Sequence, residues 1–239
     1  MGTLILFVVA LLPAILLWIY VWKKDKQQEP SEWLVKAVMW GVAICIPVAF
    51  LEGGIESAIF GDRLPSNLFE TSIMAFFVAA IPEEAFKLLA LWLVLRKNRY
   101  FDEHYDGIVY AVCVGLGFAA LENVCYVFSE EENWIGVAIA RALLAVPGHY
   151  AFAVLMGYYY SIYHFVDHSA KVAICILAVP VVAHGIYDAI AMSGIYNPYV
   201  GGLSFFALVY FCLRMHQFAR QKMLAQIERD NTDSEINVA

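Results

Sequence analysis

MGTLILFVVALLPAILLWIYVWKK, residues 1–24, is an unbroken apolar run that ends at two lysines. A helix rises about 1.5 Å per residue and the hydrocarbon core of a bilayer is about 30 Å thick, so roughly 20 apolar residues can cross it. The run is long enough to do so. No basic residue precedes it and no A-x-A-like cleavage pattern follows it, so we interpret it as a retained membrane helix rather than a cleaved signal.

The rest of the chain repeats this pattern. Of its 239 residues, 62% are hydrophobic and 15% are charged, whereas a soluble domain has about 25% charged residues. Apolar runs lie near residues 2–22, 33–51, 67–95, 106–128, 134–162, 170–192 and 199–213. They predict an all-α membrane protein, a polytopic bundle of about seven transmembrane helices. The bundle forms a single membrane domain, residues 1–213.

Lysine and arginine residues predict the orientation, because they gather in the cytoplasmic loops of membrane proteins. They follow the first, third, fifth and seventh runs, at Lys23, Lys24, Lys26, Arg96, Lys97, Arg99, Lys171, Arg214, Arg220 and Lys222. The alternate loops contain only Arg63. We therefore expect a multi-pass protein of the cell membrane with its N-terminus outside and its C-terminus inside. Residues 214–239 are then a cytoplasmic tail, which we expect to fray and become disordered after Arg220.

The formal net charge of −7 indicates little about partners, because much of the acid excess lies in the expected outer loops and the tail. The outer loop near 52–66 takes in Glu52 and Glu56 under this assignment. No basic stripe suits a nucleic acid. The expected surroundings are the lipid bilayer and a membrane-anchored protein, with no nucleic acid.

Charged residues inside the apolar runs are the informative ones. A charge near the bilayer centre costs roughly 2.5–3.5 kcal/mol, so an acid there indicates function unless a partner neutralises it. The third run contains Pro82-Glu83-Glu84-Ala85-Phe86-Lys87. On a helix Lys87 shares a face with both Glu83 and Glu84. We expect Lys87 to hold one carboxylate ionised and to leave the other free, and we expect Pro82 to break the helix.

The fourth and fifth runs add further polar side chains. The fourth contains Gly115-Leu116-Gly117, which permits close helix approach, followed by Glu122 and Asn123. The fifth contains Arg141, for which we favour a structural pairing with an acid, and Pro147-Gly148-His149. Asn123 suits either an interhelical hydrogen bond or the site, and His149 either a structural hydrogen bond or a water-filled cavity beside a helix break.

The sixth run contains His184 and Asp188, one helical turn apart on the same face. An aspartate so placed can orient the imidazole. Counted along their runs at about 1.5 Å per residue, Glu83, Glu122, His149 and His184 all lie near mid-membrane. Carboxylates and imidazoles on four helices at one depth predict one shared site.

Four motifs, PEEAFK, GFAALEN, PGHY and HGIYD, each in its own run, together resemble the PrsW family of intramembrane proteases. That family is related to the type II CAAX prenyl endopeptidases and to bacteriocin-processing enzymes. The resemblance covers roughly residues 31–211. It departs from the CAAX pattern in two places: Lys87 replaces an arginine, and Glu122 replaces a histidine. Lysine lacks the bidentate fork of arginine, and His149 can compensate for the second change.

The resemblance implies peptide-bond hydrolysis within or beside the bilayer. The family role it implies is first-site cleavage of a membrane-anchored anti-sigma factor in a stress-signalling cascade. Such hydrolysis needs an activated water, an oxyanion stabiliser and a proton for the leaving amine. We assign Glu83 as general base and Glu84 with Lys87 as the pair that orients it.

The remaining catalytic candidates lie on the other runs. His184, placed by Asp188, donates to the oxyanion, and Glu122 or His149 shares the water. A metal-dependent version uses Glu122, His149 and His184 as ligands of a divalent metal such as zinc, with an open position for water. We favour the mechanism without a metal, and the cofactor stays open.

Other classes of function fit part of this pattern. A proton-coupled transporter or channel also uses buried Glu and His residues as a relay, but no inverted repeat is visible. A haem or quinone protein ligated by His149 and His184 is a third class. Serine or cysteine nucleophiles fit less well, because the sequence has no GxSxG motif.

Overall fold

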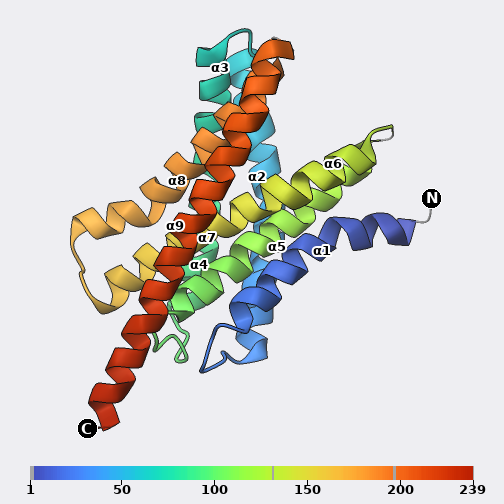
Figure 1. Cartoon of the computed structure of the whole chain (residues 1–239). Coiled ribbons are helices and arrows are strands. Elements are labelled where there is room, and N and C mark those ends of the chain that lie inside the picture. Colours follow the sequence, from blue (N-terminus) through green and yellow to red (C-terminus); the bar gives the residue numbers. More distant parts are fainter. Residues whose placement is uncertain (1–2, 131, 196–197, 239) are drawn as a thin grey trace.

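The computed structural model describes residues 3–130, 132–195 and 198–238, and all the regular structure within these ranges is helical. The elements are α1 (Thr3–Trp22), α2 (Ser31–Phe60), α3 (Leu68–Ile73), η1 (Met74–Ala80), α4 (Ile81–Leu95), α5 (Asp106–Ser129), α6 (Trp134–Ala140), η2 (Arg141–Ala145), α7 (Val146–Phe165), α8 (Ala170–Met192), η3 (Ser193–Ile195) and α9 (Pro198–Val238) (Figure 1). The all-α prediction is confirmed.

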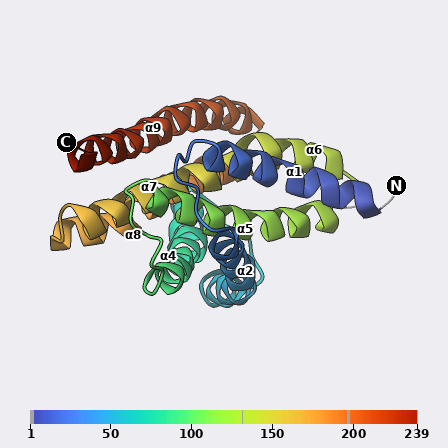
Figure 2. The same ribbon diagram turned by 90° about the horizontal axis from the view of Figure 1, so that it is seen from below.

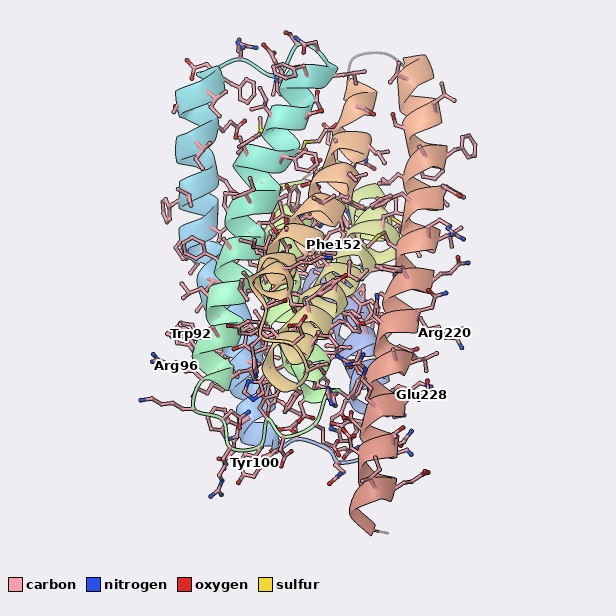
Figure 3. All side chains as sticks on the ribbon, turned by 90° about the vertical axis from the view of Figure 1, so that its left-hand side faces the viewer. Trp92, Arg96, Tyr100, Phe152, Arg220 and Glu228 are labelled. Atoms are coloured by element: carbon pink, nitrogen blue, oxygen red, sulfur yellow. The ribbon has the colours of Figure 1, made fainter. Side chains whose placement is uncertain are left out.

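Five helical segments in the described residues are long and apolar enough to cross a bilayer, so the chain is a multi-pass membrane protein. They are 4–22, 31–60, 106–129, 134–165 and 170–192. The count of seven spans and the orientation stay predictions. Arg96 and Tyr100, which follow α4, lie toward the same end of the bundle as Glu228 of α9 (Figure 3).

Helix α2 is longer than the predicted span of 33–51. It continues through Gly53 and Gly54 to Phe60 and ends at Gly61, whose φ of 62° suits glycine and whose N–H donates to the Ser57 carbonyl oxygen. The assignment of Glu52 to an outer loop is therefore wrong. The acid and the glycine pair looked like a loop, but both belong to the helix.

Helix α5 lies at the centre of the bundle and packs against α1, α2, α4 and α7 (Figure 2). Glycines set its distance from α2. A Cβ on Gly41 of α2 would clash with the Val114 carbonyl oxygen, and a Cβ on Gly117 would clash with that of Val38. The predicted role of the fourth run in close packing is confirmed, and this contact fixes how far α5 enters the core.

Two π-helical segments precede the site-bearing helices. In η1 and η2 the backbone hydrogen bonds reach back five residues instead of the four of an α-helix. The Ile81 N–H donates to the Phe76 carbonyl oxygen, and the Val146 N–H donates to the Arg141 carbonyl oxygen. Pro82 and Pro147 follow directly, and neither ring nitrogen can donate. The predicted breaks at these prolines are wrong, because the chain stays helical and absorbs the missing donor as a π-bulge. Such bulges are frequent at functional sites.

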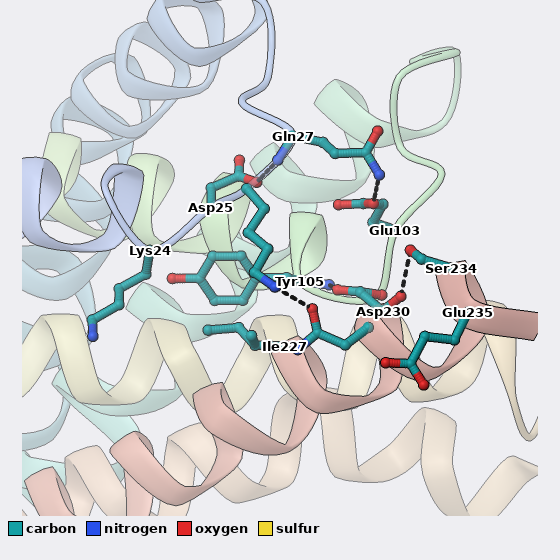
Figure 4. A pocket seen from close by; sticks show the side chains of 11 residues that line it. Lys24, Asp25, Gln27, Glu103, Tyr105, Ile227, Asp230, Ser234 and Glu235 are labelled. Atoms are coloured by element: carbon teal, nitrogen blue, oxygen red, sulfur yellow. Dashed lines mark hydrogen bonds between the residues drawn. The ribbon is translucent and has the colours of Figure 1, made fainter. Parts of the chain in front are cut away.

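Helix α9 continues far beyond the predicted seventh run, as the long red helix of Figure 1 shows. Ala219, Met223 and Gln226 are fully buried, so disorder after Arg220 is wrong for the described part of the tail. The Asp230 carboxylate accepts hydrogen bonds from the backbone N–H groups of His104 and Tyr105, at 2.7 and 2.9 Å. Figure 4 shows Asp230 beside Tyr105. The tail thereby caps the start of α5.

Candidate active site

Lys87 is the hub of the buried polar residues. Its ammonium donates hydrogen bonds to Glu83 Oε2 and to Glu84 Oε1, each at 2.8 Å, and all three side chains are buried. Spacings of four and three residues on α4 make both contacts possible. The expectation that Lys87 pairs with one carboxylate and frees the other is wrong, since it holds both.

The same ammonium reaches His149 on α7. Lys87 Nζ lies 3.1 Å from His149 Nδ1, and His149 Nε2 lies 2.9 Å from Glu122 Oε2. A protonated lysine has donors only, so Nδ1 accepts from it and the Nε2–H donates to Glu122. The ring of Phe118 covers the ammonium at 4.4 Å. His149 is thus oriented by groups on two other helices.

Glu122 is paired as well. Arg141 donates to Glu122 Oε2 at 2.6 Å and to Asn123 Oδ1 at 2.7 Å. The Asn123 amide in turn donates to the Ala10 carbonyl oxygen of α1 at 2.6 Å. The structural pairing favoured for Arg141 is confirmed, and Asn123 makes the interhelical hydrogen bond. Glu122 therefore links His149 to the hydrogen bonds that Arg141 and Asn123 make between helices.

His184 on α8 lies between two carboxylates. Its Nδ1 is 2.9 Å from Glu84 Oε1, and its Nε2 is 3.2 Å from Asp188 Oδ2. Phe152 of α7 stacks on the ring with a centroid distance of 4.8 Å. Phe152 lies in the interior of the bundle (Figure 3). These contacts leave the imidazole little freedom to turn.

A cavity of about 330 Å³ opens beside these side chains. Its ionisable lining is Glu52, Glu83, Glu122, Arg141, His149, His184 and Asp188. Glu84 and Lys87 lie behind this wall, with 0% and 3% of their surface exposed. Glu83 therefore faces the cavity, while Glu84 and Lys87 hold the cavity-facing groups in place.

Glu52 also lines the cavity, although it was not among the predicted site residues. It comes from α2, and its Oε1 is buried without a hydrogen-bond partner among the residues that the structure describes. It lines the cavity from α2 instead of lying in the loop to which it was assigned. Continuing the helical repeat of the second run by one turn would have placed this acid at membrane depth.

The geometric prediction of one shared site is met. Four helices, α4, α5, α7 and α8, bring together the predicted residues Glu83, Glu84, Lys87, Glu122, His149, His184 and Asp188. Their individual catalytic roles stay predictions.

The donor set also fits a metal ion. Glu83, His149 and His184 each offer a ligand atom within 4.8 Å of the other two. One carboxylate with two imidazoles is a zinc-type set. Each imidazole is held by a carboxylate on another helix, His149 by Glu122 and His184 by Glu84, as metal-ligating histidines usually are. The predicted set had Glu122 in place of Glu83, but Glu122 is not in the described group whose ligand atoms lie within 4.8 Å of one another.

Comparison with known proteins shows to which family a chain with this site belongs. The model of the PrsW family of intramembrane metalloproteases matches residues 29–215, which include every residue of the site. The chain belongs to this family. It is 34% identical to Protease PrsW of Clostridioides difficile (strain 630), over 78% of this chain and 79% of the relative. It is 32% identical to Protease PrsW of Bacillus subtilis (strain 168), over 90% and 95% of the two chains.

Membership of the PrsW family makes the chain an intramembrane peptidase, as the four motifs suggested. It also removes the transporter, channel and haem alternatives as descriptions of the main activity. No solved structure matches the chain. The geometry of this PrsW site therefore stands on the contacts described above.

Proposed function

We propose that the chain hydrolyses a peptide bond of a membrane-anchored protein, with a single-span anti-sigma factor as the substrate class. The observation that carries the proposal is the cavity of about 330 Å³, which Glu83, His149 and His184 share inside the bundle. The family resemblance, rather than any contact, suggests the anti-sigma factor. A cleaved anti-sigma factor would release its sigma factor and start a stress response.

Without a metal, Glu83 and His184 have separate roles in the hydrolysis. Glu83 faces the cavity and accepts the proton of the attacking water, while Lys87 holds its other side. His184 is held at Nδ1 by Glu84, and its Nε2–H donates to the oxyanion of the peptide carbonyl in place of its contact with Asp188. Preorganisation supports this assignment, because Lys87 holds Glu83 and Glu84 holds His184 from behind the cavity wall.

Glu52 is a cavity carboxylate with a buried oxygen that has no described partner, and we assign it the proton that the leaving amine requires. Its Oε1 has no other described partner, so a substrate or water can engage it without displacing an existing contact. Two acids that line the same cavity then transfer the protons: Glu83 takes one from the water and Glu52 gives one to the leaving nitrogen. General acid–base help of this kind is worth about 10²–10⁴-fold in rate.

A metal fits the same site, and the family's description as metalloproteases favours it over the metal-free preference. Glu83, His149 and His184 would hold the ion. A bound zinc ion would supply Lewis acidity to the peptide carbonyl and to a water. In that case Glu122 and Glu84 keep the two imidazoles in the orientation that ligation requires, and Glu52 is the free carboxylate that takes the proton of the water.

The activity is tested with the purified chain in proteoliposomes and a single-span anti-sigma factor. We expect two fragments whose new ends, read by mass spectrometry, lie in or beside the membrane segment. If the wild-type protein cuts another membrane protein but leaves the anti-sigma factor intact, the proposed substrate class is wrong. No cleavage of any membrane protein would overturn the proposal.

The metal is tested separately by elemental analysis of the purified protein. We expect about one zinc per chain, lost together with activity on chelation and restored together by zinc. A His149→Ala, His184→Ala double variant should retain less than a tenth of the metal. Full activity in metal-free protein would instead support Glu83 acting alone.

A further inference from the structure

Two apolar grooves open on the outside of the bundle. The α6–α9 groove has a volume of about 570 Å³ and runs between α6 with η2 on one side and α9 on the other, with Pro147 of α7 at its base. The α1–α2 groove has a volume of about 390 Å³ and lies between α1, α2 and α5. Both are lined almost entirely by apolar side chains, as any lipid-facing surface would be.

Only one of the two adjoins the cavity. Ala140 and Leu144 line both the α6–α9 groove and the cavity that holds Glu83. Leu208 of α9 also lines the cavity, one residue before Val209 of the groove. None of the residues that line the α1–α2 groove lines the cavity. Of these two grooves, the α6–α9 groove is therefore the one that lies next to the site.

The walls of the α6–α9 groove suit a helix. Leu143, Phe205 and Leu213 are 68%, 56% and 60% exposed, so they present apolar surface that nothing in the bundle covers. Gly136 and Ala140 lie four residues apart on α6, a small-xxx-small spacing that lets a second helix backbone approach closely.

We infer that the α6–α9 groove receives the transmembrane helix of the substrate and leads it to Glu83. The inference rests on the proposed function, because a substrate anchored in the bilayer must reach an interior cavity from the lipid side. Polar backbone groups cannot be left unpaired in hydrocarbon, so unwinding of the substrate helix belongs where the groove meets the polar cavity, at Ala140 and Leu144. The π-bulge η2 contains Leu144 of that junction and Leu143, which lines the groove beside it.

Photo-crosslinking tests this docking without relying on cleavage. A photoreactive phenylalanine analogue is placed at Leu143 or Phe205, and in matched controls at Ile15 or Met39 of the α1–α2 groove, which are 48% and 58% exposed. The probe is a labelled peptide with one apolar segment of about 20 residues in proteoliposomes. We expect peptide adducts at Leu143 and Phe205, at least five times those at the control positions. Equal labelling at all four, or lipid adducts only, would overturn the inference.

A second measurement separates this inference from the proposed function. Leu143→Trp should lower cleavage of the single-span substrate at least tenfold and leave cleavage of a short water-soluble peptide with the same scissile sequence unchanged. Met39→Trp is the control and should change neither. Equal losses on both substrates would contradict the groove, because the defect would then lie in the catalytic centre. Adducts at Leu143 without cleavage of any substrate would leave docking standing and remove the proposed function.

Discussion

Glu84 on α4 and His184 on α8 meet through a contact of 2.9 Å between Oε1 and Nδ1. The same Glu84 oxygen accepts from Lys87 at 2.8 Å, so one fully buried carboxylate oxygen links the lysine hub to the imidazole. Asp188 holds the other ring nitrogen at 3.2 Å. The second glutamate of the pair is therefore a positioning residue, and its effect on chemistry passes through His184.

Glu84→Gln should lower kcat for substrate cleavage by about 10–100-fold, which is the usual cost of losing a carboxylate that orients a histidine. KM should change little, because Glu84 does not line the cavity. Steady-state cleavage in proteoliposomes measures both constants. A rise in KM alone would contradict the positioning role, and thermal unfolding checks that the variant is folded.

Glu52→Gln should lower cleavage by about 10²-fold or more and remove one limb of the pH–rate profile, because an amide cannot relay a proton. Glu56→Gln, one turn further along α2 and outside the cavity lining, is the matched control and should retain the wild-type rate. Similar rates for all three proteins, with unchanged pH profiles, would show that Glu52 takes no part.

Part of the site could be predicted from the sequence, and particular residues show why the rest could not. Glu83, Glu122, His149 and His184 could be predicted to meet, because each costs free energy in the bilayer and each lies at the same depth. Depth says nothing about rotation around a helix axis, so the double pairing of Lys87 could not be predicted. Glu52 was missed because an acid beside two glycines has the composition of a loop, while tertiary packing decides where α2 ends.

The packing of the C-terminal tail against the bundle could not be predicted from the sequence either. Met223 and Gln226 look like parts of a solvated helix in a charged sequence, but they are buried against the bundle. The capping of α5 by Asp230 joins positions more than a hundred residues apart, and no local periodicity encodes such a contact.

Gly41→Ala should destabilise the bundle by about 1–3 kcal/mol, the typical cost of overpacking a close contact, because its Cβ would clash with the Val114 carbonyl oxygen. Gly54→Ala lies on the same helix with nothing within 4 Å of its Cβ, and it should be neutral or slightly stabilising. Thermal unfolding in detergent compares the two. Equal stabilities would contradict the close α2–α5 packing.

The pH dependence of stability should show the effect of Glu29, between α1 and α2. Burial raises its pKa from 4.5 to about 7, while the Tyr110 hydroxyl donates to it and Asp25 repels it. The folded chain holds this proton more tightly than the unfolded chain, so the stabilisation is complete below 4.5 and is lost as the pH rises through about 7.

The Tm difference between wild type and Glu29→Gln, followed across that pH range in detergent, isolates this contribution. Relative to the variant, the wild type should lose Tm as the pH rises. A difference that is constant, or that grows in favour of the wild type, would show that Glu29 is not buried as the structure places it.

The cleavage rate of Glu83→Gln measures the central claim most directly. In proteoliposomes with a single-span substrate, this variant should lose cleavage by at least about 10³-fold whether Glu83 acts as base or as metal ligand, while Glu56→Gln cleaves at the wild-type rate and all three proteins unfold at similar temperatures. Cleavage by Glu83→Gln at the wild-type rate would contradict the assignment of this cavity as the active site.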